Sequence, residues 1–455
     1  MERFDVFVIG GGGTGSQIAY RLAERSGLRA AIAERDKLGG ECSHYGCVPT
    51  KVMLRSAKIA RLARDASRFG VSIPSVEIDL PAIQRRAQEV IDARSGRGAR
   101  PFEDAGITVY LQQARLVADR RIELEDGTQL EVDRVVFATG TETAVPSIPG
   151  LADGPYWTNR EAIWAPDAPP GSLAVIGAGA IGIEFAQIYA GFGASVTAIE
   201  ALPQILPDED DDAAAALVPA LEEEGIRLLL GSTIERAEHD GRAWTILLAD
   251  GTTLRGEELL VATGRRPAFG GHDLDAVGME LDDGGRPVLS DTLRATAPNV
   301  WVAGDATGEL LFTHVGSYEA ELVIDDILGR PRTRDYRVVP RVTFCDPEVA
   351  SVGLTERAAR DAGHDVRTAI VRLDENERSD IDGRPFGLVK LVADAGSDEL
   401  LGGHIVGDEA GAMIHEVVAA MSGRVPASAI GDAIHAYPTL SESVKEAFLG
   451  LGVRS

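Results

Sequence analysis

The chain has 455 residues, enough for about three domains of ~150 residues each. It carries 71 acidic and 45 basic residues, and the net charge of −26 argues against nonspecific binding to nucleic acid or to an anionic membrane, because both require a basic surface. Three cysteines are too few for a secreted disulfide scaffold, and the N-terminus lacks the pattern of a signal peptide. No uncharged apolar run is long enough to span a bilayer. We therefore expect a cytoplasmic protein that binds neither nucleic acid nor membrane.

The first forty residues have the pattern of a βαβ unit. Residues 4–9 form an apolar run typical of a buried parallel strand, a helical pattern follows, and residues 30–33 form a second strand. Between the strands lies G-x-G-x-x-G, in which glycines permit a tight turn close to a pyrophosphate and the following helix offers its N-terminus. An acidic residue at the end of the second strand can accept hydrogen bonds from ribose hydroxyls. The predicted dinucleotide-binding residues are Gly10, Gly12, Gly15 and Glu34.

A second unit of the same kind begins near residue 173. Strands at 173–176 and 195–199 flank another glycine fingerprint and a helical pattern. Two complete fingerprints predict two dinucleotides, although a duplicated fold with one inactive copy is an alternative. A carboxylate at the ribose position favours NAD over NADP, because it would repel a 2′-phosphate, and the residues just after it include no arginine. The predicted residues are Gly177, Gly179, Gly182 and Glu200.

Further repeats connect these two units. Strands ending in Ala-Thr-Gly occur at 138–140 and 262–264, and each follows a hairpin pattern with an acidic-Gly turn. These segments mark equivalent points in two related domains. From about residue 338 the strand and helix patterns indicate an α+β module. The acidic run 208–212 opens a helical segment, and we expect it to be a solvated helix N-terminus.

The pair Cys42 and Cys47, separated by four residues, lies between the first fingerprint and an amphipathic helical pattern. A disulfide that closes so short a loop removes little unfolded-state entropy, so stabilising the fold is a poor reason to have it. Close thiols beside positive charge or a helix start can have a lowered pKa, which favours a redox role. Lys51, one of only five lysines, lies in the same segment.

The segment Gly39–Lys51, the paired fingerprints, residues 342–353 and residues 435–442 together resemble the flavoprotein (pyridine nucleotide) disulfide oxidoreductase family, which includes dihydrolipoyl dehydrogenase and mercuric reductase. The resemblance covers essentially the whole chain. It implies an α/β fold with two Rossmann-like dinucleotide-binding domains and a C-terminal α+β dimerisation domain. The implied boundaries are 1–145 with 272–337 for a discontinuous FAD domain, 146–271 for the NAD domain and 338–455 for the dimerisation domain.

The resemblance also implies roles for single residues. Cys47 would lie against the flavin as a thiolate, Cys42 would meet the substrate, and Lys51 and Glu184 would form an ion pair near the flavin; a solvated Lys51 is the alternative. A homodimer is expected, because Tyr437 and Glu442 would reach Cys42 only from a second subunit. The FAD site would consist of Gly10, Gly12, Gly15, Glu34, Thr139, Gly140, Gly304 and Asp305, and the NAD(H) site of Gly177, Gly179, Gly182, Glu200 and Gly264.

One position departs from the family pattern. Members that act on thiol or disulfide substrates usually carry His-x-His-Pro, whose second histidine is the acid–base partner of the substrate-side thiol, and here Tyr437 occupies that place. A tyrosine with a pKa of about 10 is a poor base at neutral pH. His44 or His435 could substitute, although His435 is better interpreted as a structural histidine. Cys345 is interpreted as structural, because nothing in the sequence pairs with it.

The predicted function follows from these residues. Electrons would pass from NADH to FAD, to the Cys42–Cys47 disulfide, and on to a dihydrolipoamide-like disulfide substrate. The alternative is an NADH-dependent reductase of a quinone, a dye or a metal ion, which needs no acid–base partner for a thiol. Mercuric reductases carry a C-terminal cysteine pair that this chain lacks. A redox-responsive binding protein is a third hypothesis, which nothing in the sequence favours.

Overall fold

The computed structural model describes residues 1–96 and 98–452, which divide into two compact units. The first unit comprises Met1–Val52, Ala82–Ala144 and Gly264–Asp335. The second comprises Met53–Pro81, Val145–Thr263 and the described chain from Tyr336 onward. The three-domain division expected from the sequence stays a prediction, because compactness separates only these two units.

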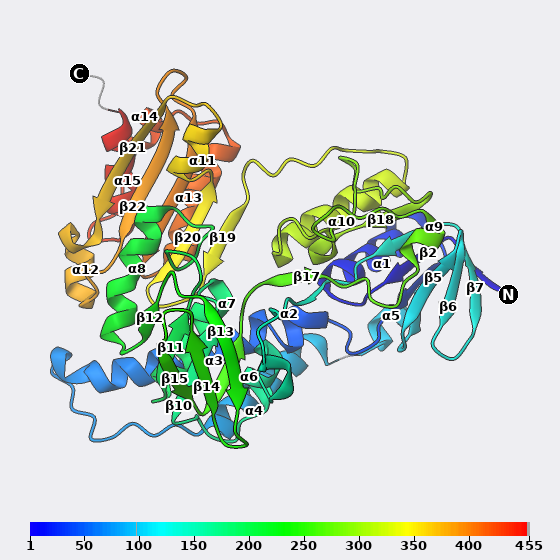
Figure 1. The fold of residues 1–455 in the computed structure, drawn as a ribbon. Coiled ribbons are helices and arrows are strands. Elements are labelled where there is room, and N and C mark those ends of the chain that lie inside the picture. Colours follow the sequence, from blue (N-terminus) through cyan, green and yellow to red (C-terminus); the bar gives the residue numbers. More distant parts are fainter. Residues whose placement is uncertain (97, 453–455) are drawn as a thin grey trace. The chain divides into compact units, whose positions relative to one another are not determined.

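A five-stranded parallel sheet forms the centre of the first unit. Helices α1 (Gly13–Ser26) and α10 (Thr313–Ile327) pack against each other and share an apolar cluster with this sheet (Figure 1). The predicted βαβ unit is confirmed, since β2 (Val6–Ile9), α1 and β3 (Ala30–Ala33) follow in order and the two strands pair in parallel. The sheet has the order β18 (Val300–Val302), β8 (Val135–Phe137), β2 (Val6–Ile9), β3 (Ala30–Ala33) and β4 (Thr108–Tyr110).

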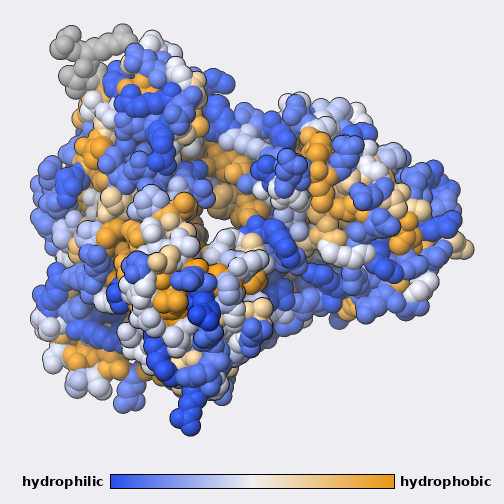
Figure 2. Space-filling model, in the orientation of Figure 1, coloured by the Kyte–Doolittle hydropathy of each residue, from blue (hydrophilic) through white to orange (hydrophobic). Residues whose placement is uncertain are grey.

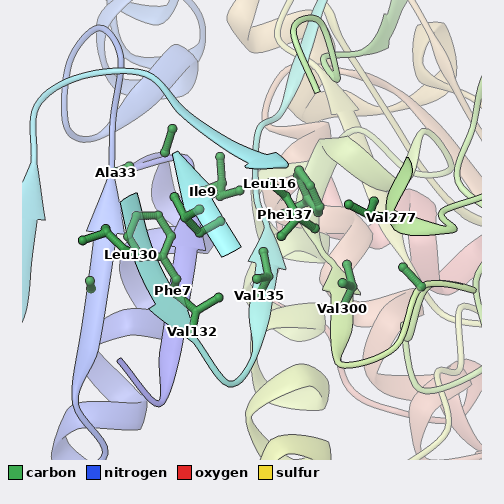
Figure 3. Close-up of a cluster of buried hydrophobic side chains, with 14 of the residues drawn as sticks. Phe7, Ile9, Ala33, Leu116, Leu130, Val132, Val135, Phe137, Val277 and Val300 are labelled. Atoms are coloured by element: carbon green, nitrogen blue, oxygen red, sulfur yellow. The ribbon is translucent and has the colours of Figure 1, made fainter. Parts of the chain in front are cut away.

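A second sheet of the first unit packs on the face of the parallel sheet that is opposite to α1 and α10. Figure 3 shows side chains from both sheets in one buried cluster, with Phe7 and Phe137 between Leu130 and Val300. The predicted strand at 4–9 is divided between the two sheets, because the chain turns at Asp5, whose carboxylate accepts a hydrogen bond from the Arg29 N–H (2.8 Å). The second sheet has the order β1 (Glu2–Phe4), β7 (Gln129–Val132), β6 (Arg121–Leu124) and β5 (Ala114–Ala118).

The second unit repeats this plan around its own parallel sheet. Strand β10 (Ser172–Ile176) pairs in parallel with β11 (Ser195–Ile199) on one side and β16 (Glu258–Val261) on the other. Strand β2 pairs with β3 and β8 in the same way. The predicted second βαβ unit is therefore confirmed. Both predicted hairpins are also confirmed, since β6 pairs antiparallel with β7 in the first unit and β14 (Trp244–Leu248) with β15 (Thr253–Gly256) in the second. The parallel sheet has the order β12 (Arg227–Leu229), β11 (Ser195–Ile199), β10 (Ser172–Ile176) and β16 (Glu258–Val261), with α7 (Ala180–Gly191) and α8 (Asp211–Glu223) as its helices; the antiparallel sheet consists of β13 (Ile234–His239), β14 (Trp244–Leu248) and β15 (Thr253–Gly256).

The chain after residue 338 forms an antiparallel sheet covered by helices, as the α+β interpretation predicts. Helices α13 (Ala410–Ser422) and α15 (Ser441–Gly452) bury their apolar faces on this sheet (Figure 1). The sheet has the order β19 (Pro340–Thr343), β20 (Glu348–Gly353), β23 (Leu400–Gly407), β22 (Leu388–Asp394) and β21 (Val366–Arg372); the other helices are α11 (Glu356–Asp361), α12 (Glu377–Asp382) and α14 (Ala427–Gly431).

The remaining elements are short or connect these layers. The long helix α3 begins at Cys47, as the amphipathic pattern after the cysteine pair predicts. The face drawn in Figure 2 is mostly hydrophilic, in keeping with the high charge of the chain. Within the described ranges, every helix is too short or too polar to cross a membrane. These elements are α2 (Gly40–His44), α3 (Cys47–Asp65), α4 (Leu80–Ser95), α5 (Arg100–Asp104), β9 (Thr141–Thr143), α6 (Asn159–Trp164), β17 (Arg265–Pro267), α9 (Leu274–Val277) and the 3₁₀ turns Ala66–Phe69, Leu151–Asp153, Gly304–Thr307 and Leu373–Glu375.

The acidic run 208–212 begins a helix, as the sequence suggested, but it is only partly solvated, because Glu209 and Asp210 are buried. Asp210 caps helix α8, and its side chain is only 3% exposed. Lys390, equally buried on β22, donates hydrogen bonds to Asp210 (2.9 Å) and Asp212 (2.6 Å) and forms an ion pair with Glu356 (2.8 Å). Burial alone lowers the pKa of Lys390, but its three carboxylate partners outweigh that effect and raise it. Part of the acidic run is therefore buried because a distant lysine compensates its charge.

Replacing Lys390 by alanine should leave Asp210 buried without its cation. We expect a loss of stability of about 3–5 kcal/mol, because breaking a buried ion pair from one side leaves an uncompensated charge. The measurement is the shift in the midpoint of urea unfolding. Lys445→Ala on α15 is the matched control and should change stability by less than about 0.5 kcal/mol. Equal midpoints for the two variants would contradict the assigned role of Lys390.

Candidate active site

The first glycine fingerprint, residues 10–15, forms a tight backbone loop, the first cradle, in which only glycine fits at key positions. Gly10, at the carboxyl end of β2, has φ +108°, and a Cβ atom placed on it would lie 2.2 Å from the carbonyl oxygen of Ala138. A Cβ on Gly15 would lie 2.0 Å from the carbonyl oxygen of Gly10. The loop therefore lies against the end of β8, where the strand order reverses, and α1 begins directly after Gly12. This is the place where open parallel sheets bind dinucleotides.

Glu34 is oriented by the same loop. Its carboxylate accepts hydrogen bonds from the N–H groups of Gly11 and Asp36, both at 2.7 Å. A pocket beside Glu34 is also lined by Arg35 and His272, among others. Burial, with Arg35 and Arg115 nearby, lowers the pKa of His272 to about 4, so this imidazole is neutral at physiological pH. The pocket therefore has a neutral ring and an oriented carboxylate, which suit the adenosine end of a dinucleotide.

Further predicted FAD residues lie at the ends of β8 and β18. Within the described chain, the hydroxyl oxygen of Thr139 is buried without a hydrogen-bond partner, which a bound ligand would supply. The turn after β18 is held by the buried Glu319, which accepts a hydrogen bond from the Gly304 N–H (2.6 Å). Burial raises the pKa of Asp305, the neighbouring Arg265 lowers it, and Glu41 raises it further. The cradle, the unpaired hydroxyl and this turn fit FAD.

The second fingerprint repeats the geometry of the first. Gly177 has φ +98°, and a Cβ on it would lie 2.5 Å from the carbonyl oxygen of Ala262. A Cβ on Gly182 would lie 2.0 Å from the Gly177 carbonyl oxygen. Glu200 accepts hydrogen bonds from the N–H groups of Ala178 (2.8 Å) and Leu202 (2.9 Å), as Glu34 does in the first site. The chain therefore builds two cradles of one design, and the second fits a pyridine nucleotide.

The two cysteines lie where helices begin. Cys42 is half-buried in α2, and Cys47 is the first residue of α3; both are free thiols. A hydrogen bond from Cys42 is the main cause that lowers the pKa of Cys47 to about 6, against the opposing effect of burial. The positive charge of Lys51 and the hydroxyl of Thr313 lower it further, and the Thr313 Oγ1 atom lies 3.8 Å from the Cys47 Sγ atom. The shared hydrogen bond raises the pKa of Cys42, so Cys47 is the thiolate of the pair.

The other predicted residues form local contacts. Glu184 is buried, and its carboxylate accepts a hydrogen bond from the Phe344 N–H (3.0 Å); its pairing with Lys51 stays a prediction. Gly264 accepts a hydrogen bond from the Ala144 N–H (3.0 Å), and its part in the nucleotide site also stays a prediction. Cys345 is buried, which raises the pKa of its thiol, in keeping with a structural role.

The C-terminal motif serves the local fold. His435 forms a hydrogen bond with Glu416 (2.9 Å), which matches its interpretation as a structural histidine. Glu442 accepts a hydrogen bond from the Thr439 N–H (3.1 Å) at the start of α15. The side chain of Tyr437 is 70% exposed, and the ring of His44 lies 2.9 Å from the Leu38 carbonyl oxygen. Within residues 1–96 and 98–452, no group of three or more His, Cys, Asp or Glu side chains is arranged to hold a metal ion.

Sequence reasoning missed several residues of the first unit. Thr313 contacts the thiol pair from 266 residues away, and no motif marks it. Arg265 donates hydrogen bonds to Thr141 and lies 3.6 Å from the carboxylate of Glu41. Its position directly after the repeated Thr-Gly pair is a signal that could have revealed it. Glu319 gave no signal, because a glutamate in a helix usually faces water.

Comparisons with known proteins agree with this geometry. Residues 4–320 match the family model for pyridine nucleotide-disulphide oxidoreductases, and residues 339–448 match the model for the dimerisation domain of that family. A dihydrolipoyl dehydrogenase from Chlorobaculum tepidum is 36% identical over 457 residues, covering 98% of this chain and 96% of that protein. A mercuric reductase from Bacillus cereus is 32% identical, covering 98% of this chain and 71% of that protein. The solved structure of a Cu(II) complex of the HOCl-induced flavoprotein disulfide reductase RclA from Escherichia coli superposes with a TM-score of 0.89 at 28% identity, covering 99% of both chains.

The chain belongs to the pyridine nucleotide-disulphide oxidoreductase family. It is an NAD(P)H-dependent flavin oxidoreductase of the EC 1.8.1 type, and its cofactors are FAD and NAD(P)H. The expected fold class is confirmed: α/β, with the nucleotide-binding regions followed by the dimerisation domain of the family.

The asymmetry of the thiol pair predicts a pH profile for alkylation of the reduced protein. Above pH 6 Cys47 is a thiolate and reacts quickly with iodoacetamide, whereas below pH 6 it is protonated and reacts slowly. Replacing Lys51 by methionine removes a positive charge, so the midpoint should rise by roughly half to one pH unit. Peptide mass spectrometry measures the rate at Cys47, and Lys37→Met is the control. A midpoint near the ordinary cysteine pKa of about 8.5 would contradict the assignment.

Proposed function

We propose that this protein transfers electrons from NADH through FAD to a Cys42–Cys47 disulfide, and from the resulting dithiol to a small disulfide substrate of the lipoamide kind, which becomes a dihydrolipoamide-like dithiol. The observation that carries the proposal is the unequal pair of thiols, with the pKa of Cys47 lowered to about 6 and that of Cys42 raised. A thiol pair with one stable thiolate suits an exchange reaction, because the two sulfurs can take different roles.

The proposed electron transfer has two stages. FAD, when bound, would supply two electrons taken as a hydride from NADH. These electrons break the Cys42–Cys47 bond, one proton is taken up at Cys42, and Cys47 is left as the thiolate. Cys42 then loses its proton to a base and attacks one sulfur of the substrate, which releases one thiol. The base returns this proton to the first leaving sulfur. The Cys47 thiolate attacks the Cys42 sulfur of the mixed disulfide, which restores the Cys42–Cys47 bond and releases the second sulfur as a thiolate that takes a proton from solvent.

We also propose that the active protein is a homodimer and prefers NADH. The match of residues 339–448 to the dimerisation domain supports the first point, with Tyr437 and Glu442 then reaching Cys42 from a second copy. Glu200 supports the second point, because its carboxylate is held at the ribose position by two backbone N–H groups and would repel a 2′-phosphate.

A second candidate is reduction of a quinone, a dye or a metal ion. Cys42 has a raised pKa, and the position of the expected histidine is occupied by Tyr437, so deprotonation of Cys42 lacks its usual base. An outer electron acceptor needs no such base. Similarity to a mercuric reductase and to RclA, whose structure is a Cu(II) complex, adds support for a metal-ion acceptor.

Replacing Cys42 by serine separates the two candidates. The disulfide route should lose about a thousandfold or more of its NADH-dependent lipoamide-type reduction rate, because the attacking sulfur is gone. Reduction of ferricyanide or a quinone should persist. Both rates are measured anaerobically by NADH absorbance, with Cys345→Ala as the control. Wild-type protein that reduces no disulfide but does reduce metal ions or quinones would reject the first candidate.

Replacing Tyr437 by histidine restores the base expected at that position. If deprotonation of Cys42 limits turnover, disulfide reduction near pH 7 should rise by about a hundredfold, the usual contribution of a well-matched acid–base residue. Tyr437→Phe is the matched control and should leave the rate unchanged. An equal rate for both variants would show that the fit of the substrate, not the base, limits the reaction.

A further inference from the structure

A threonine that belongs to none of the motifs lies at the thiol pair. Thr313 is the first residue of α10, and its Oγ1 atom lies 3.8 Å from the Cys47 Sγ atom, within hydrogen-bond range for sulfur. Cys47 is itself the first residue of α3. Two helices of 15 and 19 residues therefore begin at this sulfur, and the positive end of each dipole favours a thiolate there.

The hydroxyl of Thr313 interacts with both sulfurs. Its hydrogen bond lowers the pKa of Cys47, and a second interaction lowers the pKa of Cys42. A hydroxyl rotates freely and can donate to either acceptor. It can therefore follow the negative charge when that charge moves from one cysteine to the other.

An ordinary structural role for this threonine does not account for the contact. Threonine at a helix start usually stabilises the helix as the N-cap, where its oxygen accepts a backbone N–H. In α10 the N-cap is Phe312, and Thr313 lies one position inside the helix. The hydroxyl is directed at sulfur instead of the first turn, and the side chain is exposed.

We propose that Thr313 is a catalytic residue of the Cys42–Cys47 site, whose hydroxyl donates a hydrogen bond to whichever sulfur carries the negative charge. The inference rests on the proposed dithiol function. In the reduction step two electrons from NAD(P)H break the S–S bond, one proton goes to Cys42, and Cys47 keeps the negative charge. Thr313 keeps its own proton throughout and holds that charge. Its contribution matters more here because Tyr437 stands where the family has a histidine.

The test uses a Cys42→Ser background, in which Cys47 is the reactive thiol of the site. In this background Thr313→Val removes the hydroxyl at nearly constant shape, Thr313→Ser retains it, and Thr292→Val removes a hydroxyl elsewhere in the same unit. The readout is the pH midpoint of Cys47 alkylation by iodoacetamide in the FAD-containing protein. Thr313→Val should raise the midpoint by roughly half to one pH unit, while Thr313→Ser and Thr292→Val leave it in place.

Identical pH midpoints of Cys47 alkylation for Thr313→Val and for the Cys42→Ser protein without it would overturn the inference. If Thr313→Val does not bind FAD, Thr313→Ala gives the same comparison. The same Thr313 substitutions are also made in the protein that retains Cys42, and its rate of disulfide reduction is measured. This rate separates the inference from the proposed function. A shifted midpoint with no disulfide reduction by any variant, wild type included, would reject the proposed substrate and retain Thr313 as the residue that stabilises the thiolate.

Discussion

The hydrogen bond from the Cys42 thiol to Cys47 is the interaction on which the proposed chemistry of this protein depends. It lowers the pKa of one sulfur and raises that of the other, so the reduced pair carries a single, located negative charge. The chain as a whole has a net charge of −26, which disfavours a further negative charge on Cys47 through long-range repulsion. Groups close to Cys47 therefore have to stabilise the thiolate. Lys51, one helical turn after Cys47, and the starts of α3 and α10 do so.

The fold places this pair next to a cradle that the chain builds twice. Gly10 approaches the carbonyl of Ala138, and Gly177 approaches that of Ala262, at distances that exclude any side chain. In both cradles an acidic residue is already held by backbone N–H groups before any ribose arrives. Binding then costs less ordering of that side chain. The first cradle adds a buried, unpaired Thr139 hydroxyl that a ligand would satisfy.

The acceptor side of the reaction is organised differently. His435 and Glu442, which the family motif would place around a catalytic base, bind Glu416 and the backbone of Thr439. Both therefore stabilise the C-terminal module in a single copy. Tyr437 is left exposed, available to a second copy or to a substrate. The FAD and NAD(P)H cofactors on the electron-donating side are those of the family. On the acceptor side, the proposed reaction differs from the family pattern in the group that would deprotonate Cys42, because Tyr437 stands at the position of the expected histidine.

Local patterns in the sequence determined the two βαβ units, both hairpins, the α+β module and the cysteine pair, because tight turns and strand or helix periodicity involve neighbouring residues. Contacts between distant residues were decided only by the tertiary structure. Thr313 meets Cys47 across 266 positions, and Lys390 meets Asp210 across 180. The same rule explains why the expectation for residues 208–212 was right about the helix start and wrong about the solvation of Glu209 and Asp210. A run of carboxylates has the same local pattern whether it is solvated or buried, and only the folded chain shows which cation compensates it.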